Sequence, residues 1–157
     1  MNPTPIREYD PHSAPSRGFS QPAQEDSTID THTIVRIAAE AALDKKATEL
    51  TLLDVGGLTS FCDWFILCNG SNTRQIQAIG QAIVRSLKER GVQPLGIEGM
   101  EQSRWILIDL GDVLVHVFDE PMRGYYDLDG LWADAPRVAL GDIGIEEPPQ
   151  AMATPAK

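Results

Sequence analysis

Two aspartates and a histidine near residue 110 have the residue types of a catalytic or metal-binding site. Asp109 and Asp112 flank a predicted turn, and His116 follows four residues later. Two-metal phosphoryl transfer needs carboxylates that converge on two ions about 4 Å apart, but no third carboxylate is placed to join this pair. His116 has no serine or cysteine placed beside it as a nucleophile. We therefore predict no catalytic residue and no metal site.

Residues 68–73, Cys-Asn-Gly-Ser-Asn-Thr, lie between a predicted strand and a predicted helix, where backbone amides can hold an anion. The segment lacks the second and third glycines of a dinucleotide fingerprint and the lysine of a phosphate loop. Asn72 with Gln75 three residues later resembles a capping box. The pattern favours a capped turn over a nucleotide site, and we predict no cofactor.

The aspartates and the histidine belong to residues 105–118, WILIDLGDVLVHVF, which predict a β-hairpin. With Leu110-Gly111 as the turn, Asp109 lies opposite Asp112 and Trp105 opposite His116. Alternation then gives an aliphatic core face, which contains Ile106, Ile108, Val113, Val115 and Val117. The other face contains Trp105, Leu107, Asp109, Asp112, Leu114 and His116.

That second face has an aromatic residue surrounded by carboxylates, a composition typical of the centre of a protein interface. A solvated sheet face is the alternative interpretation. The assignment depends on the register, because a slip of one residue would exchange the two faces.

The periodicities of the whole chain predict one α/β (α+β) domain with a mixed sheet of about five strands flanked by helices. Helices are expected from Asp30 or Thr31, from Asn72 to Gly91, and from Asp119; further strands are expected at 50–54, 63–68 and 95–97. Residues 1–27 are rich in Pro, Ser and Gln and predict a disordered tail. The domain is expected at 28–135, followed by a mostly disordered tail at 136–157.

The composition is that of an ordinary soluble protein, with 157 residues and 42% hydrophobic content. We expect no membrane span and no secretory signal, because no apolar run is long enough. Acidic residues near the N-terminus argue against a transit peptide. Cys62 and Cys68 would lie about 20 Å apart on an extended strand, too far for a disulfide. We expect reduced thiols and a cytoplasmic protein.

The net charge of −10 is unevenly distributed. Residues 30–91 contain seven acidic and seven basic residues, whereas residues 92–135 contain nine acidic and two basic ones. Direct wrapping of a nucleic-acid backbone, which needs clustered Lys and Arg, is not expected. The acidic half suits a basic partner whose approach it would steer; solubility alone is the competing explanation.

Several short motifs occur together in the order of one known family. They are Asp63-Trp64-Phe65, Gly70-Ser71, Arg74-Gln75, Gly96-Ile97-Glu98-Gly99, Trp105, Asp109-Leu110-Gly111-Asp112, His116-Val117-Phe118, Arg123, Tyr126 and Leu131-Trp132. From about Thr28 to Ala135 the chain closely resembles the ribosomal silencing factor (Iojap-related) family.

The resemblance implies a fold related to nucleotidyltransferases without their catalytic site, and a protein that is not an enzyme. It implies binding to the large ribosomal subunit through ribosomal protein fourteen, a block on joining of the small subunit, and lower translation when nutrients are scarce. The implied contact surface includes Glu98 and Trp105, with Leu107, Asp109 and His116 on the same face. No sequence-specific contact with nucleic acid is expected. The sequence does not decide whether the protein forms a homodimer. The alternative function is a nucleotide-dependent transferase.

Overall fold

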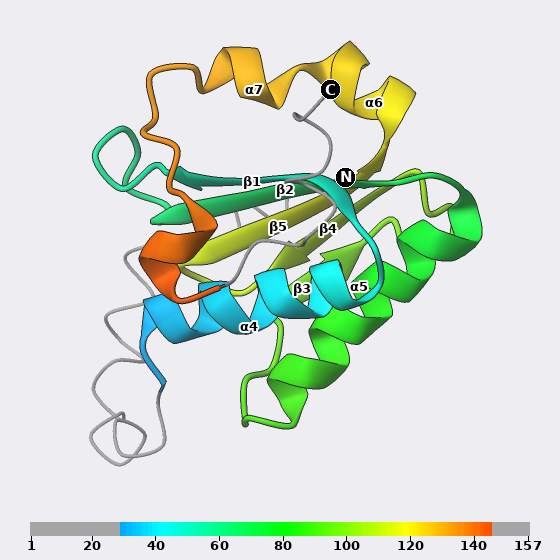
Figure 1. The fold of residues 1–157 in the computed structure, drawn as a ribbon, viewed down its shortest axis with the longest axis horizontal. Helices are drawn as coiled ribbons and strands as arrows, with labels where there is room; N and C mark the ends of the chain where they lie inside the picture. Colours follow the sequence, from blue (N-terminus) through cyan, green and yellow to red (C-terminus); the bar gives the residue numbers. More distant parts are fainter. Residues whose placement is uncertain (1–28, 146–157) are drawn as a thin grey trace.

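The fold is a five-stranded mixed sheet with helices on both faces (Figure 1). A computed structural model describes residues 29–145 of the protein. The strands, in the spatial order β1-β2-β5-β4-β3, are β1 (Thr48–Asp54), β2 (Trp64–Gly70), β5 (Val113–Asp119), β4 (Trp105–Asp109) and β3 (Gly96–Glu98). Only β2 and β5 pair in parallel; the other neighbours are antiparallel. The predicted fold class is confirmed.

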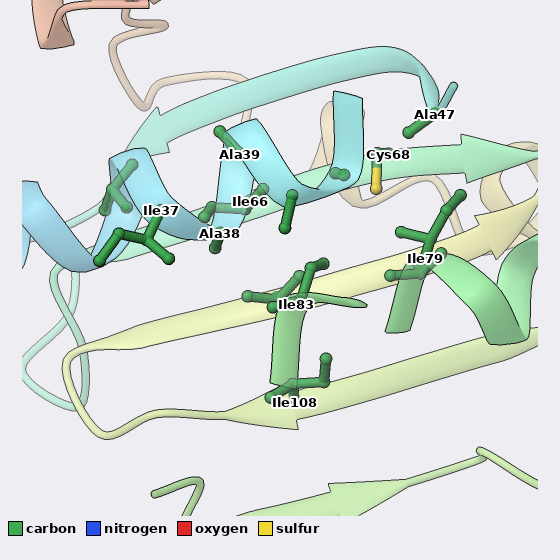
Figure 2. Packing of buried hydrophobic residues seen from close by; sticks show 14 of the residues in the cluster. Ile37, Ala38, Ala39, Ala47, Ile66, Cys68, Ile79, Ile83 and Ile108 are labelled. Carbon is green, nitrogen blue, oxygen red and sulfur yellow. The ribbon is translucent and has the colours of Figure 1, made fainter. Parts of the chain in front are cut away.

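Two long helices, α4 (Thr31–Asp44) and α5 (Thr73–Lys88), cover one face of the sheet (Figure 1). Asp30 caps α4 by accepting a hydrogen bond from the backbone N–H of Thr33, and Asn72 caps α5 in the same way with Gln75. Both caps agree with the predicted helix starts, because a short polar side chain satisfies an otherwise free amide of the first turn. Aliphatic side chains of the helices and the sheet interlock beneath them (Figure 2).

The hairpin confirms the predicted core face but corrects the predicted pairing. All five aliphatic residues assigned to that face, Ile106, Ile108, Val113, Val115 and Val117, are fully buried in the helix-covered core. Trp105, however, lies opposite Phe118, and Asp109 opposite Leu114. The register therefore differs by two residues from the predicted one, and a shift of two preserves which face each side chain occupies.

The correction arises at the turn. The N–H of Leu110 donates to the carbonyl of Val113 at 2.9 Å, which makes Gly111-Asp112 the two-residue loop instead of Leu110-Gly111. Gly111 has a φ of 94°, a conformation that glycine adopts at little cost at the first central position of a hairpin turn.

Two short helices, α6 (Glu120–Tyr126) and α7 (Leu128–Leu131), cover part of the opposite face (Figure 1). Met122, Leu128 and Trp132 pack there on a second cluster of buried residues, which includes Phe65 and Phe118. Asp119 caps α6 by accepting from the N–H of Met122, and a proline lies in its first turn, as predicted. The sheet is thus the middle of three layers.

The chain beyond residue 135 corrects the predicted domain end. The N–H of Val138 donates to the carbonyl of Leu52 at 2.9 Å, and Arg137 forms an isolated β-bridge with Leu53. The 3-10 helix η1 (Leu140–Ile143) and the buried side chain of Ile145 then pack against the helix-covered core. The ordered domain therefore extends at least to residue 145. The predicted tails at 1–27 and beyond 145 lie outside the described residues.

Candidate partner-binding surface

The predicted contact residues lie on one face of the sheet, the face opposite α4 and α5. Opposed residues of neighbouring strands share a face, and Glu98, Leu107 and His116 lie opposite one another across β3, β4 and β5. Trp105 and Asp109 lie two residues before and after Leu107, so they point to the same side. The structure therefore brings all five predicted site residues together.

Exposure differs among the five residues. Glu98 is exposed, while Trp105, Leu107 and Asp109 on β4 are partly buried. His116 is only 6% exposed. We call the group of Glu98, Trp105, Leu107 and Asp109 the β4 surface. His116 contacts this surface through Trp105 and does not form its exposed part.

Trp105 is held by one hydrogen bond and two aromatic neighbours. Its indole N–H donates to Nδ1 of His116 at 3.1 Å. Its ring centroid lies 5.1 Å from that of Phe118 and 4.6 Å from that of Tyr126. These contacts fix the orientation of the indole while part of it stays accessible, which suits a rigid anchor for a partner.

His116 is a neutral hydrogen-bond acceptor in this arrangement. Burial, with a smaller effect of the Arg123 charge, lowers its pKa from 6.5 to about 3. Since Nδ1 accepts the Trp105 N–H, the ring proton belongs on Nε2. Nε2 is buried and has no hydrogen-bond partner among the described residues. An imidazole that cannot become charged near neutral pH is unsuited to acid–base exchange but well suited to positioning Trp105.

The surface continues onto α6 through two tyrosines that were not among the predicted site residues. Tyr126, which contacts Trp105, is 46% exposed, and Tyr125 is 79% exposed. Their rings meet edge to face at a centroid distance of 4.9 Å. Sequence patterns could not place them at the site, because the contact between Tyr126 and Trp105 joins residues far apart in the chain.

Arg123 fixes α6 and α7 to the sheet. Its guanidinium donates to the carbonyl of Glu49 at 2.6 Å, to Oδ1 of Asn69 at 3.1 Å and to Oγ1 of Thr51 at 2.9 Å. It also makes a two-pronged ion pair with Asp129, at 3.0 and 3.1 Å, which lowers the pKa of that carboxyl group. Because only 11% of the Arg123 side chain is exposed, the bonds are shielded from water and hold Tyr126 beside Trp105.

Carboxylates follow the edge of the β4 surface. Oδ1 of Asp109 accepts from the N–H of Gly111 at 2.9 Å, which fixes the carboxylate at the hairpin turn. Asp112 has its pKa raised by burial and by the nearby Asp63. Within residues 29–145, no three or more His, Cys, Asp or Glu side chains are grouped so that they could hold a metal ion.

The two cysteines are separate, buried and unreactive. Cys62 and Cys68 are both free thiols, and burial raises the pKa of each to about 12. A thiol with so high a pKa carries almost no thiolate at neutral pH, and the thiolate is the reactive form.

The loop before α5 uses its own side chains to satisfy the start of the helix. Asn72 accepts from the N–H of Gln75 at 2.8 Å, and the side-chain oxygen of Gln75 accepts from both the N–H and the hydroxyl of Ser71. The predicted capped turn is therefore confirmed, although Gln75 reaches back to Ser71 and not to the cap residue.

No helix in the described part of the chain is long and apolar enough to cross a membrane.

Comparison with known proteins identifies the family of this chain. The family model described as "Ribosomal silencing factor during starvation" matches residues 28–157. The ribosomal silencing factor RsfS of Bacillus subtilis is 43% identical over 114 residues, covering 73% of this chain and 96% of that protein. The chloroplastic protein Iojap of Arabidopsis thaliana is 31% identical over 102 residues, covering 65% of this chain and 42% of that protein.

The fold is also found among solved structures. A crystal structure of a protein from Chromobacterium violaceum superposes with a TM-score of 0.66 at 38% identity, covering 67% of this chain and 88% of that one. A second crystal structure, from Bacillus halodurans, gives a TM-score of 0.62 at 40% identity, covering 68% of this chain and 97% of that one. The chain belongs to the ribosomal silencing factor family.

Proposed function

We propose that this protein binds the large ribosomal subunit through ribosomal protein fourteen and, while bound, prevents the small subunit from joining. Translation falls as a result, which suits a cell short of nutrients. The site of action is the cytoplasm, where free subunits meet. Membership of a family of ribosome-silencing translation regulators supports the regulatory role. Ribosomal protein fourteen as the partner, and subunit joining as the step that is blocked, are what we propose.

The observation that carries the proposal is the partly exposed Trp105 at one end of the β4 surface. Its indole is oriented by His116 and by aromatic neighbours, while Glu98 and Asp109 lie on the same sheet face. Interfaces concentrate their binding free energy in such rigid aromatic residues. Carboxylates beside the anchor complement a basic surface, and ribosomal proteins are usually basic.

Steric exclusion explains how such a protein acts without chemistry. A domain that occupies a surface needed by the small subunit lowers the concentration of complete ribosomes in proportion to its own occupancy. The proposal requires only an interface and no active site.

Sedimentation tests the proposal. Purified protein mixed with large subunits should travel with them in a sucrose gradient, and added small subunits should then form fewer complete ribosomes. A Trp105→Ala variant serves as the matched control. It is used at the same concentration after its folding has been verified, and it should stay near the top of the gradient. Failure of the wild-type protein to travel with large subunits, or undiminished subunit joining in its presence, would contradict the proposal.

A further inference from the structure

The exposed side of α5 is a row of basic and amide side chains. Arg74, Gln81, Arg85 and Lys88 are all exposed, and their spacing of seven, four and three residues places them along one side of a helix. The opposite side of α5 is buried against the sheet through Ile76, Ile79, Ile83 and Leu87. The row therefore faces away from the core.

Three further cations lie near the two ends of this row. The side-chain amide of Gln75 donates to the carbonyls of Lys45 and Lys46, both at 3.0 Å, and so ties the end of α4 to the start of α5. Lys45, Lys46 and Arg90, which follows α5, are exposed. We call these residues the basic stripe: Lys45, Lys46, Arg74, Arg85, Lys88 and Arg90. Asp44 and Glu89 are the exposed acidic residues adjacent to it in the chain.

The basic stripe differs from the other cations of the domain in its ion pairing. Each of the remaining four described basic residues is within ion-pair distance of a carboxylate: Arg36, Arg104, Arg123 and Arg137. None of the six stripe residues forms an ion pair with another residue of the 29–145 segment. Their charges are thus not neutralised within the described domain.

The chemistry of the stripe favours phosphate over protein or membrane as its partner. Protein interfaces depend on aromatic or aliphatic anchors, yet no large hydrophobic residue of α5 is exposed. The apolar side of α5 is packed on the sheet, so it is not available for insertion into a lipid surface. Binding to a nucleic-acid backbone needs only Lys, Arg and polar donors such as Gln.

The position of the stripe allows it to act together with the β4 surface. The helix α5 packs on the face of the sheet opposite α6 and the β4 surface (Figure 1). Neither surface blocks the other. We propose that the basic stripe contacts the phosphate backbone of ribosomal RNA, without reading its sequence, while the β4 surface binds the ribosomal protein. This inference rests on the proposed function, and it adds RNA as a second partner on the opposite side of the domain.

The first test compares salt dependence in two variants with the same net charge. The stripe variant is Arg74→Gln/Arg85→Gln/Lys88→Gln, and the matched control is Arg36→Gln/Arg104→Gln/Arg137→Gln. Affinity for intact large subunits is measured between about 50 and 200 mM salt, the range over which phosphate contacts weaken strongly. Each lost contact should reduce the slope of log affinity against log salt by roughly 0.7–0.9, so the loss of three contacts should reduce it by about 2–3.

The affinity of the same variants is also measured for isolated ribosomal protein fourteen, in the absence of ribosomal RNA. The stripe variant and the control should bind it equally, whereas the stripe variant should bind intact subunits at least tenfold more weakly than the control. Equal affinities and slopes on intact subunits would overturn the inference and leave the proposed function standing. No binding of wild-type protein to intact subunits would overturn the proposed function and this inference with it.

The second test identifies the molecule that the stripe touches. A photoreactive amino acid replaces Gln81, which lies within the row but carries no charge, in the full-length protein bound to large subunits. Irradiation should produce a crosslinked protein–RNA product whose size decreases after ribonuclease treatment. A crosslink to a ribosomal protein, unchanged by ribonuclease, would overturn RNA as the partner.

Discussion

At the scale of single residues, the hydrogen bond from the Trp105 indole to His116 joins a surface residue to a buried one. The imidazole accepts through Nδ1 because burial keeps it neutral. Removal of either side chain therefore affects both the binding surface and the interior, and the two effects must be measured separately.

Truncation of Trp105 should weaken both the binding and the fold. Trp105→Ala removes the anchor of the β4 surface, which we expect to cost about 2 kcal/mol or more in binding, roughly a thirtyfold loss of affinity. It also leaves Nδ1 of His116 without its donor, so the free energy of unfolding should fall by about 1–3 kcal/mol. Thermal melts paired with subunit pelleting measure the two losses. Trp105→Phe, which keeps a ring but lacks the N–H, should bind with intermediate affinity; normal binding by folded Trp105→Ala would remove Trp105 from the interface.

His116 should make the domain less stable in mild acid. Its pKa in the folded state is about 3, below its ordinary value of 6.5, so between these values the unfolded chain binds a proton that the folded chain does not. The free energy of unfolding should therefore fall as the pH drops below about 6.5, by up to about 1.4 kcal/mol per pH unit. Urea unfolding of the wild-type protein and of His116→Gln from pH 7 to pH 5 measures this slope. The variant should lack the His116 component, and identical slopes would show that His116 is not buried in its neutral form.

At the scale of elements, the short helices α6 and α7 depend on tertiary contacts. Each contains fewer residues than an isolated helix needs for stability in water, and neither contains a buried residue. The Arg123 network therefore supplies a fixed connection between α6 and the strands β1 and β2.

Loss of Arg123 should destabilise the domain strongly. Arg123→Ala leaves Asn69 without its cationic donor and Asp129 with only the longer contact to Arg137, at 3.6 Å. The free energy of unfolding should fall by about 3 kcal/mol, as for other broken buried pairs. Arg123→Lys should recover little of this loss, because the ammonium group of lysine cannot reproduce the five N–H donors of the planar guanidinium group. Arg104→Ala is the control: its pair with Asp119 is 56% exposed on the arginine side and should contribute under about 1 kcal/mol. Equal losses in a denaturant titration would contradict the assigned role of Arg123.

The segment after residue 135 should contribute to stability. A chain that ends at residue 139 lacks Ile143 and the buried Ile145, whereas one that ends at residue 145 keeps both. Burial of one such side chain contributes about 1.5–3 kcal/mol, so the shorter chain should have the lower melting temperature. Equal melting temperatures would show that residues 140–145 do not contribute to the stability of the folded unit.

The sequence predicted the strands and both long helices because local signals determine them. Alternation of period two identified the core face of the hairpin, and Asp30 and Asn72 identified the helix starts. The register was off by two residues because Leu110-Gly111 and Gly111-Asp112 are both glycine-containing pairs, and alternation cannot distinguish shifts of two. The burial of His116 and the packing of residues 136–145 depend on segments far apart in the chain, which leave no periodic signal.

At the scale of the whole molecule, charge is divided between the two faces of the sheet. The balanced composition of residues 30–91 concealed this division, because six of their seven basic residues belong to the basic stripe. The acidic residues of the β4 surface lie on the other face. A charge distribution of this kind orients a protein as it approaches a charged partner.

Charge reversal on the β4 surface should therefore slow association more than it speeds dissociation. Glu98→Lys and Asp109→Lys should lower the association rate with ribosomal protein fourteen at low salt, and the effect should fade as the salt concentration rises, because exposed charges are screened. Stopped-flow binding at several salt concentrations measures this. Glu40→Lys, on α4 away from the β4 surface, is the control; an equal effect of the control would attribute the change to net charge alone.

The parallel pairing of β2 with β5 has a consequence for the order of folding during synthesis. Trp64 pairs with Val113 and Gly70 with Asp119, so the centre of the sheet joins segments that are far apart in the chain. Contacts between distant segments form late, after the cost of closing the loop between them has been met. The strands β2 and β5 therefore cannot pair until residue 119 has left the exit tunnel. This protein thus completes the sheet that contains its β4 surface only after the ribosome that makes it has translated most of the message.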